Sequence, residues 1–522
     1  MGVTGHRQLA NPERVAAGVR EALQRIHGRV ASSGQTVVFT VVSPLAEGAD
    51  QIVADEALKF IDTRLEVPLP LEPRAYLRHS FESQVAGEHF LELLDVAHRT
   101  GTVIDPPEAD DADEAYEAVG RYVVESSDVV IAVYDGAASR GVGGTARIVE
   151  LAKARSRPLY LVSPEGEAPL VKEPENEWPE TFAQLRALNE TRLGPTSFAA
   201  NRNRFQHDMM KAADRFDIDP VTVRAALEWI SPYYVRADML AQKFQSQYTV
   251  IGLALFLLAA AAVTVVVAQI IFWPEQPSIV GLEIGFMLLL PGLLYLGRSR
   301  DLRGRWLASR FLAERFRSAP YLAMSGLGGQ RPRLLADQKV GMPESWLQRA
   351  YLEVWARRPA PDSMRVKIDG LKKFLAEAWV NGQIDHHRQR SEAYRRLHEQ
   401  LGWLTAILYS ATLVAAVLHF FEVGGHATVA SVELSHLFTF VAIVLPAFGG
   451  AVTGIRIQRE LPRRADRYDQ LVILLQRSYE ELRDARDLEA LQQVAINADE
   501  HQARHNRDWV GDMKFHDFEL HV

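Results

Sequence analysis

The stretch VIGLALFLLAAAAVTVVVAQIIFW, residues Val250–Trp273, decides the architecture of this 522-residue chain. It contains no charged residue, and it is longer than the roughly 20 apolar residues that an α-helix needs to cross a bilayer. A buried core helix is the alternative, but apolar runs of that kind are usually shorter. The stretch therefore predicts a transmembrane helix, and we expect the chain to be embedded in a lipid bilayer.

Three further apolar runs, Ile279–Gly297, Trp403–Phe421 and Leu434–Ile455, complete a set of four predicted spans in two hairpins. The loops within the hairpins, Pro274–Ser278 and Glu422–Glu433, contain no Lys or Arg. The basic residues that flank the other ends of the spans are Arg236, Lys243, Arg298, Arg300, Arg303, Arg305, Arg395, Arg396, Arg456, Arg459, Arg463 and Arg464. Because Lys and Arg are retained on the cytoplasmic side, both termini are predicted to be cytoplasmic.

The two hairpins resemble copies of one unit in the same orientation. Each follows a polar amphipathic helix, and each continues into an arginine-rich helix, RGRWLASRFLAERFRSA after the first and RRADRYDQLVILLQRSYEELRD after the second. Pro291 and Pro446 interrupt the second span of each hairpin and predict a kink. In the fourth span, Gly450 and Gly454 provide a small-residue face that permits close helix packing.

Ionisable residues are rare in the spans. Glu283 lies near the outer end of the second span, where its carboxylate can reach the headgroups. The spans lack the series of internal charges typical of a proton pump or voltage sensor, which weakens a transporter interpretation. Glu422, His426, Glu433 and His436 gather around the second outer loop, but their spacing is loose, and we predict no metal ion and no cofactor.

The composition excludes several classes of function. The chain has no cysteine, which rules out disulfides, iron–sulfur clusters and thiol catalysis. Its 58 Lys and Arg residues against 66 Asp and Glu residues give a net charge of −8, so nucleic acid is not a predicted partner. No signal peptide is evident at Met1–Arg7, so we expect the N-terminus to stay in the cytosol.

Before the membrane region, residues 1–163 alternate short apolar segments with helical patterns such as PERVAAGVREALQRIHG and TARIVELAKA. The predicted buried strands are Thr36–Val42, Leu65–Leu69, Gly101–Asp105, Asp128–Tyr134 and Pro158–Val162. This alternation predicts an α/β domain with a parallel sheet covered by helices on both faces. Only Met1–Val3 precede Thr4, so either the true start lies upstream or the first strand is unusually short.

Four segments fall at the carboxyl ends of these strands, where such sheets bind ligands. They are Gly2–Arg7, Ser43–Asp50, Pro68–Tyr76 and the segment from Asp135 to Thr145. Their glycines let backbone N–H groups approach an anion, and a helix N-terminus adds positive potential. Arg7 and Thr145 can donate to a phosphate, while Glu47 or Asp50 can hold a ribose hydroxyl. The predicted ligand-binding residues are Thr4, Gly5, His6, Arg7, Ser43, Glu47, Gly48, Asp50, Arg74, Tyr76, Asp135, Gly136, Gly143, Gly144 and Thr145.

These motifs resemble the SLOG family, whose Rossmann-like fold is shared by the DprA/SMF and LOG proteins. The resemblance rests on TGHR, SPLAEGAD, PLPLEPRAY and a strand that ends in Asp-Gly with GGTA after it, and it covers roughly Met1–Pro164. The membrane region resembles the SLATT type of effector, here doubled. Together these resemblances imply a homo-oligomeric effector in the inner membrane of a bacterium. It would sense a nucleotide-derived second messenger, such as a cyclic nucleotide or an ADP-ribose derivative, and form a pore in anti-phage defence.

This chain departs from the LOG enzymes at one position that matters for catalysis. LOG enzymes carry a catalytic glutamate three residues after the threonine of PGGxGTxxE, whereas Ile148 stands there in this chain and the nearest carboxylate is Glu150. Since hydrolysis of an N-glycosidic bond needs a correctly placed carboxylate, sensing is favoured and no catalytic residue is predicted. A membrane-anchored nucleotide hydrolase using Glu47, Asp50 or Glu150 remains the alternative. A nucleotide-regulated ion channel or transporter is the third hypothesis.

The predicted organisation follows from these assignments. Residues 1–164 form the nucleotide-binding domain, 165–247 a linker and cytosolic helices, 248–298 the first hairpin, 299–400 a cytosolic helical region, 401–457 the second hairpin, and 458–522 a C-terminal helical region.

Overall fold

The computed structural model divides the chain into two compact units, Met1–Glu190 and a second unit of Thr191–Gln338 with Leu347–Val522. The residues that the structure describes are 1–31, 37–109, 111–136, 144–175, 178, 180–327, 346–360, 367–424, 427–429 and 432–514. The first unit extends past residue 164, the predicted domain boundary, because a further strand and helix follow there. They are β7 (Val171–Lys172) and α7 (Glu180–Glu190).

The first unit is built on one sheet with the strand order β4-β3-β2-β1-β5-β6-β7. The other strands are β1 (Gly2–Gly5), β2 (Phe39–Val42), β3 (Thr63–Pro68), β4 (Thr102–Ile104), β5 (Val130–Val133) and β6 (Leu159–Val162). Neighbouring strands pair in parallel except β6 and β7, which are antiparallel. The five predicted strands and their parallel pairing are therefore confirmed, but β4 lies at the edge of the sheet and is only partly buried, whereas it was predicted to be buried. The first strand extends beyond Thr4 and pairs with β5 from Gly2 to Gly5.

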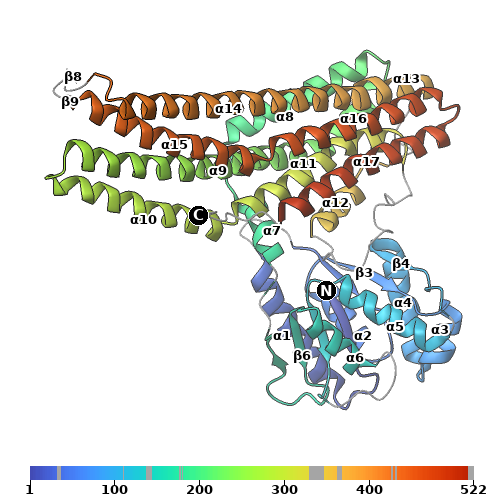
Figure 1. Cartoon of the computed structure of the whole chain (residues 1–522). Helices are drawn as coiled ribbons and strands as arrows, with labels where there is room; N and C mark the ends of the chain where they lie inside the picture. The colour runs from blue at the N-terminus through green and yellow to red at the C-terminus, as the bar shows by residue number, and fades with distance from the viewer. Residues whose placement is uncertain are drawn as a thin grey trace. The chain divides into compact units, whose positions relative to one another are not determined.

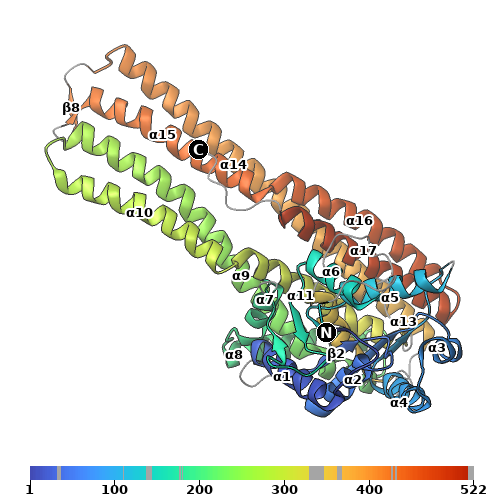
Figure 2. The ribbon, with the colours of Figure 1, turned by 90° about the horizontal axis from the view of Figure 1, so that it is seen from below.

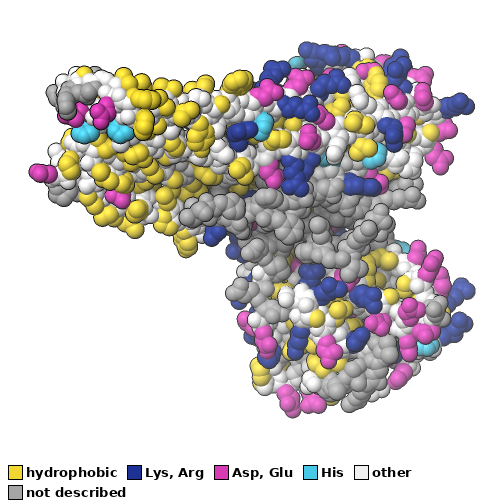
Figure 3. All heavy atoms as spheres, viewed as in Figure 1, with side chains coloured by type: hydrophobic (Ala, Val, Ile, Leu, Met, Phe, Trp, Pro, Cys, Tyr) yellow, Lys and Arg dark blue, Asp and Glu magenta, His cyan; other side chains and the backbone are white. Residues whose placement is uncertain are grey.

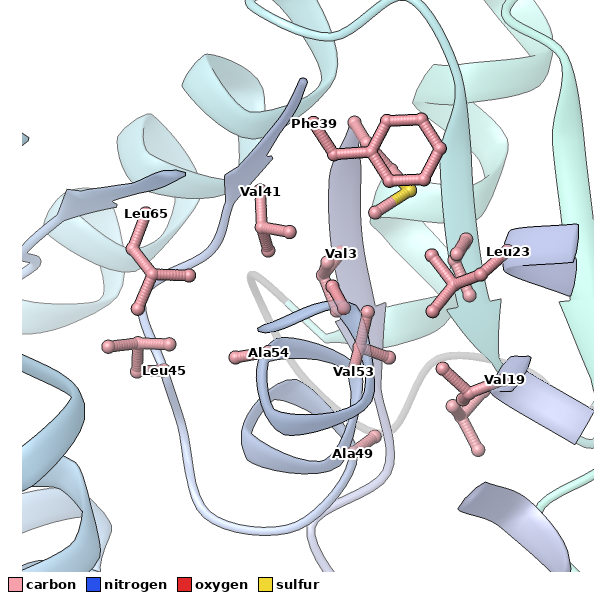
Figure 4. Close-up of a cluster of buried hydrophobic side chains, with 14 of the residues drawn as sticks. Val3, Val19, Leu23, Phe39, Val41, Leu45, Ala49, Val53, Ala54 and Leu65 are labelled. Atoms are coloured by element: carbon pink, nitrogen blue, oxygen red, sulfur yellow. The ribbon is translucent and has the colours of Figure 1, made fainter. Parts of the chain in front are cut away.

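Helices cover both faces of this sheet. Successive side chains of β5 point to opposite faces, and they pack against different helices. Ile131 and Val133 belong to the larger core, which includes residues of α1, α2 and α4, whereas Val130 and Ala132 pack with residues of α5 and α6. Figure 4 shows the larger core, where Val53 of α2 lies among side chains of α1 and β1. The helices are α1 (Pro12–Val30), α2 (Ala49–Phe60), α3 (Pro73–Ser80), α4 (Gln84–Thr100), α5 (Ala112–Glu125) and α6 (Thr145–Ala154).

The strand order places β1 at the centre, where the direction of chain winding reverses. The chain moves outward from β1 through β2, β3 and β4, and it then returns to β5 on the other side of β1. In open parallel sheets, such a reversal separates the loops that follow the two strands and leaves a crevice at their carboxyl ends. The ends of β1 and β5 are therefore where a ligand site is expected.

The second unit is helical, with a small β8–β9 hairpin (Thr428–Val429 and Val432–Glu433). Its helices are α8 (Pro195–Asp214), α9 (Pro220–Phe272), α10 (Pro277–Ser299), α11 (Leu302–Met324), α12 (Trp346–Ala356), α13 (Ile368–Lys373), the π-helical η3 (Phe374–Asn381), α14 (Gly382–Phe420), α15 (Leu434–Arg459), α16 (Leu461–Asp484) and α17 (Leu488–Lys514). Among the described residues, four helical stretches are long and apolar enough to cross a membrane, and they contain the four predicted runs to within one residue. The prediction of four membrane-spanning helices is thereby confirmed at the level of length and composition.

The two halves of this unit follow the same plan (Figure 1). The long helix α9 packs against α10 and α11, and the long helix α14 packs against α15 and α16. Both α10 and α15 continue through their prolines, Pro291 and Pro446. Each then stops at an acidic residue with left-handed backbone, Asp301 (φ 42°) or Glu460 (φ 45°), and the next helix begins at once. On the face shown in Figure 3, apolar side chains cover the spans, acidic and histidine side chains lie at the hairpin tips, and charged side chains of both signs gather over the other part of the unit.

Candidate functional site

The reversal between β1 and β5 brings together two predicted ligand-binding residues that are far apart in the sequence. His6 follows β1 and Asp135 follows β5; His6 Nε2 lies 3.3 Å from Asp135 Oδ1 and 3.4 Å from the Asp135 backbone nitrogen. The backbone N–H of His6 donates to the Val133 carbonyl at 3.2 Å. The imidazole also stacks on Tyr134, with ring centroids 6.0 Å apart. The pairing of β1 with β5 therefore sets the position of the His6 side chain.

The His6–Asp135 pair can both accept and donate hydrogen bonds. An unprotonated Nε2 accepts from the Asp135 backbone N–H, whereas a protonated Nε2 donates to the Asp135 carboxylate. The two side chains are 32 % and 38 % exposed, so a ligand can reach them without unfolding the loops. Tyr134 was not among the predicted residues. Its place directly before Asp135, at the end of a predicted strand, is the signal that could have identified it.

Two glycines permit the loop after β1 to lie against the start of α2. A Cβ atom on Gly5 would lie 2.4 Å from Cβ of Ala49, and a Cβ atom on Gly48 would lie 2.2 Å from the Arg7 carbonyl oxygen. Gly48 also has a φ of +94°, which side chains rarely allow. The Ala49 N–H donates to the His6 carbonyl at 3.1 Å. These contacts hold His6 and the exposed Arg7 beside the N-terminus of α2.

The helices that follow β2 and β5 both begin at a glycine. Gly48 precedes α2 and Gly144 precedes α6, and neither helix has a side chain that caps its N-terminus. Both helices also pack against β1. Helix N-termini attract anions because their first N–H groups lack partners within the helix and the helix dipole is positive there. The start of α6 is therefore suited to a phosphate or another anion, whereas at the start of α2 the Ala49 N–H already donates to the His6 carbonyl.

The Ser43–Asp50 loop is held by buried polar contacts. Ser43 Oγ donates to Asp50 Oδ2 at 2.9 Å and accepts from the Leu45 N–H at 3.0 Å, and Leu45 has a left-handed φ of 57°. Asp50 is only 4 % exposed. Burial raises the pKa of Asp50 to about 7, against the opposing effects of the Ser43 hydroxyl, the Ala46 backbone and the Arg7 charge. The buried Asp50 side chain therefore stabilises the loop through its hydrogen bond with Ser43. Its carboxyl group keeps its proton below about pH 7.

Three further predicted residues lie on α3 or contact the turn that leads from α3 to α4. Glu47 Oε2 accepts from the backbone N–H groups of Glu82 at 2.7 Å and Ser83 at 3.4 Å. Arg74 is exposed at the start of α3. Tyr76 is 1 % exposed, and burial, helped by the charge of Asp50, raises its pKa well above the usual value. Of these three, Arg74 is the one whose charged end is open to a ligand.

The remaining predicted residues differ in their surroundings. Thr4 is buried within β1, whereas Thr145, the first residue of α6, is half-buried. Gly136 follows Asp135 with a φ of +87°, and a Cβ atom there would meet open space. Gly143 lies outside the described residues.

A pocket of about 340 Å³ lies between α5 and α6 and includes Glu150 in its lining. The other charged residues that line it are Glu117, Arg121 and Arg147. Arg121 and Arg147 both pair with Glu117, at 3.6 Å and 3.4 Å. Glu150 lies in the middle of α6, and the residues that line its pocket include neither His6 nor Asp135.

Comparison with models of known protein families, with curated proteins and with solved structures finds no match. Within the described residues, no group of three or more His, Cys, Asp or Glu side chains is arranged to hold a metal ion. Around the predicted outer loop, Glu433 precedes α15 and His436 is exposed, while His426 lies outside the described residues.

Proposed function

We propose that this protein is a membrane effector in which a SLOG-like domain senses a nucleotide-derived second messenger and SLATT-like spans then permeabilise the inner membrane of a bacterium. The termini are cytoplasmic in this proposal, because the basic residues cluster at that end of the spans. The ligand is a cyclic nucleotide or an ADP-ribose derivative, and the setting is anti-phage defence.

The observation that carries the proposal is the composition of the β1 edge. Two helices that follow a glycine and have no side-chain cap flank it, and the His6–Asp135 pair and Arg7 reach the surface there. Helix N-termini and arginine suit phosphate groups, while an imidazole and a carboxylate suit ribose hydroxyls. The same chain carries four helices that can cross a membrane, so ligand binding and a membrane response can be coupled within one molecule.

A nucleotide hydrolase is the second candidate, and the raised pKa of Asp50 is the observation in its favour. A carboxyl group with a pKa of about 7 can both donate and accept a proton near neutral pH. However, the same carboxyl group is 4 % exposed and accepts a hydrogen bond from Ser43. A substrate would have to displace that contact before Asp50 could act on it, so we prefer the sensor.

The full-length protein, reconstituted in dye-loaded liposomes, tests the proposal. Cyclic dinucleotides, cyclic mononucleotides and ADP-ribose derivatives are added one at a time, while dye release, binding heat and chromatographic turnover are measured on the same preparation. We expect one class of ligand to bind without turnover and to release dye. Turnover of the ligand would instead support the hydrolase, and ion-selective currents without dye release would support a nucleotide-regulated channel.

The variant Arg7→Ala supplies the matched control for the site. Arg7 is exposed, so its removal should weaken ligand binding and dye release without affecting the fold. Arg99→Ala removes an equally accessible arginine from the last turn of α4, far from the β1 edge in sequence, and should leave both readouts unchanged. Equal ligand affinity in all three proteins would exclude the β1 edge as the site.

A further inference from the structure

The first span of one hairpin packs against the second span of the other hairpin. Helix α9 contacts α15 along the membrane region. Gly454 of α15 receives the ring of Phe256, because a Cβ atom on Gly454 would lie 2.3 Å from that ring. Gly252 of α9 likewise faces Gln458, at 2.6 Å from the place of its absent Cβ atom. The hairpins are thus joined by a contact in which glycines accommodate larger side chains.

The reciprocal contact is not made within the chain. It would join α10, the second span of the first hairpin, to α14, the first span of the second hairpin. No substantial packing joins these two helices among the described residues. Figures 1 and 2 show why: α10, α9, α15 and α14 lie in a row, so that α10 and α14 form its two edges. The reciprocal contact would therefore bring together the outward face of α10 and the outward face of α14.

The outer face of α10 carries a seam of exposed residues, of which one is a serine and three are glycines. They recur at alternating intervals of three and four, the spacing that keeps side chains on one side of a helix. The seam consists of Ser278, Gly281, Gly285, Leu288, Gly292 and Tyr295, all of which are exposed. A Cβ atom on any of its three glycines would meet open space. These glycines differ from Gly252 and Gly454, which face side chains of the same chain.

The outer face of α14 has a seam with the same spacing and larger side chains. It consists of Trp403, Ile407, Ser410, Val414, Val417 and Phe421, and each of these residues is exposed. The two edges thus differ in size in the same sense as the Gly454–Phe256 part of the internal contact, where the second span provides the glycine and the first span provides the bulky side chain; the Gly252–Gln458 part has the opposite sense. Small residues let membrane helices approach closely, and large side chains opposite them fill the space.

We propose that α10 of one copy packs antiparallel against α14 of a second copy, and that this contact repeats the α9–α15 contact between chains. Such a contact is head-to-tail, because it joins two different surfaces of the chain. It generates a closed ring if the rotation from one copy to the next divides a full turn. Lipid could cover the bulky α14 seam equally well. Contact with lipid does not explain three aligned glycines on α10, because glycine weakens a helix and provides little apolar surface to lipid. Close packing against a second helix does explain them. The proposal does not depend on the ligand of the first unit.

Because the chain has no cysteine, disulfide crosslinking in membranes tests the proposal directly. Gly285→Cys and Val414→Cys are each introduced alone, into chains with different affinity tags. Both positions lie on their seams near the middle of the apolar helices. We expect oxidation to yield a dimer containing both tags when the two variants are co-expressed. Neither variant should crosslink when it is expressed alone.

The controls use exposed positions away from the seams and the contact within the chain. Met287→Cys with Leu413→Cys should not crosslink, although both residues are exposed. Phe256→Cys with Gly454→Cys in one chain should form an internal disulfide and thereby show that oxidant reaches the spans. A dimer from Gly285→Cys alone would overturn the proposal in favour of a symmetric α10–α10 contact. With the internal control positive, failure of the mixed pair to crosslink would overturn it in favour of lipid-facing edges.

Discussion

The carbonyl oxygen of Arg7 lies 2.2 Å from the position that a Cβ atom on Gly48 would occupy. The loop after β1 and the turn before α2 therefore touch through backbone atoms, at the point where the candidate site meets the sheet. No residue other than glycine fits between them, because Gly48 also has a φ of +94°. This contact fixes where His6 and Arg7 stand relative to the start of α2.

The variant Gly48→Val should therefore lower the stability of the first unit. The added side chain meets a backbone carbonyl that a rotamer change cannot move, and the positive φ adds strain. We expect a loss of about 2–4 kcal/mol, seen as faster hydrogen–deuterium exchange in β1 and α2. Gly28→Ala is the control, since Gly28 lies in α1 with open space around it and alanine favours a helix. Unchanged exchange in Gly48→Val would contradict the tight contact.

The raised pKa of Asp50 predicts a specific dependence of stability on pH. The folded protein keeps this proton up to about pH 7, whereas the usual value of the carboxyl group is 3.8. Between these values the folded state binds more protons than the unfolded state, so its stability falls as the pH rises and levels off above pH 7. In Asp50→Asn, which can still accept the Ser43 hydrogen bond, this contribution is absent.

The measurement is the difference in unfolding free energy between Asp50→Asn and the unmodified protein at several pH values. Other titrating groups cancel in that difference. We expect it to shift in favour of the variant by up to about 4 kcal/mol between pH 4 and pH 7 and to stay constant above. A difference that does not vary with pH would mean that Asp50 is ionised throughout.

The alternation of short apolar strands and helices was enough to predict the sheet, although β3 contains Arg64 and Glu66 between its buried residues. It also placed His6 and Asp135 at the same edge, since the carboxyl ends of parallel strands share one edge. The strand order was not predictable in this way. Whether β5 returns beside β1 or beside β4 depends on packing between distant helices, and it is this return that brings Asp135 to His6.

The role of each residue in the candidate site was harder to predict than its location. Asp50 and Tyr76 read as polar groups available to a ligand, yet both are almost completely buried. Their burial depends on Ser43, Phe81 and Phe90, which come from three separate segments. The four spans could be identified from their apolar length alone. Which of their faces have no helix packed against them could not be predicted, because that depends on how the two hairpins pack together.

A buried ion pair joins two distant helices of the second unit. Arg315 Nη1 of α11 lies 2.6 Å from Asp499 Oδ2 of α17, and Ser318 Oγ donates to Asp499 Oδ1 at 2.6 Å. The two charged side chains are 5 % and 4 % exposed. Asp499→Ala would leave the Arg315 guanidinium buried without its counter-charge, so we expect a loss of about 3–5 kcal/mol, seen as a lower melting temperature in detergent.

The control for this pair is Glu392→Ala, which removes the acidic partner of Arg396 on the surface of α14. Both side chains there are more than half exposed, at 74 % and 54 %. Solvent screens such pairs, and the expected loss is below about 1 kcal/mol. Equal effects of the two substitutions would show that α17 does not depend on its contact with Arg315.

Asp301 and Glu460 provide a last test, because both adopt left-handed backbone where a span gives way to the next helix. They differ in the cap that they provide. Asp301 Oδ1 accepts from the Gly304 N–H at 3.0 Å, whereas Glu460 makes no such cap and its Oε1 lies 3.5 Å from Arg463 Nη1 in an ion pair. Glycine relieves the strain at either position, but it also removes the cap at Asp301. Glu460→Gly should therefore stabilise the protein by up to about 1 kcal/mol, while Asp301→Gly should be neutral or destabilising.

Asp301→Asn separates the two effects, since asparagine tolerates the left-handed region and can still cap Gly304. We expect its melting temperature to equal or exceed that of the unmodified protein. If Asp301→Gly were instead as stabilising as Glu460→Gly, the cap would contribute nothing, and the two junctions would be equivalent in energy as well as in backbone conformation. If neither glycine variant raised the melting temperature, the left-handed junctions would not be strained, and contacts of the replaced side chains would account for the acidic residue at both places.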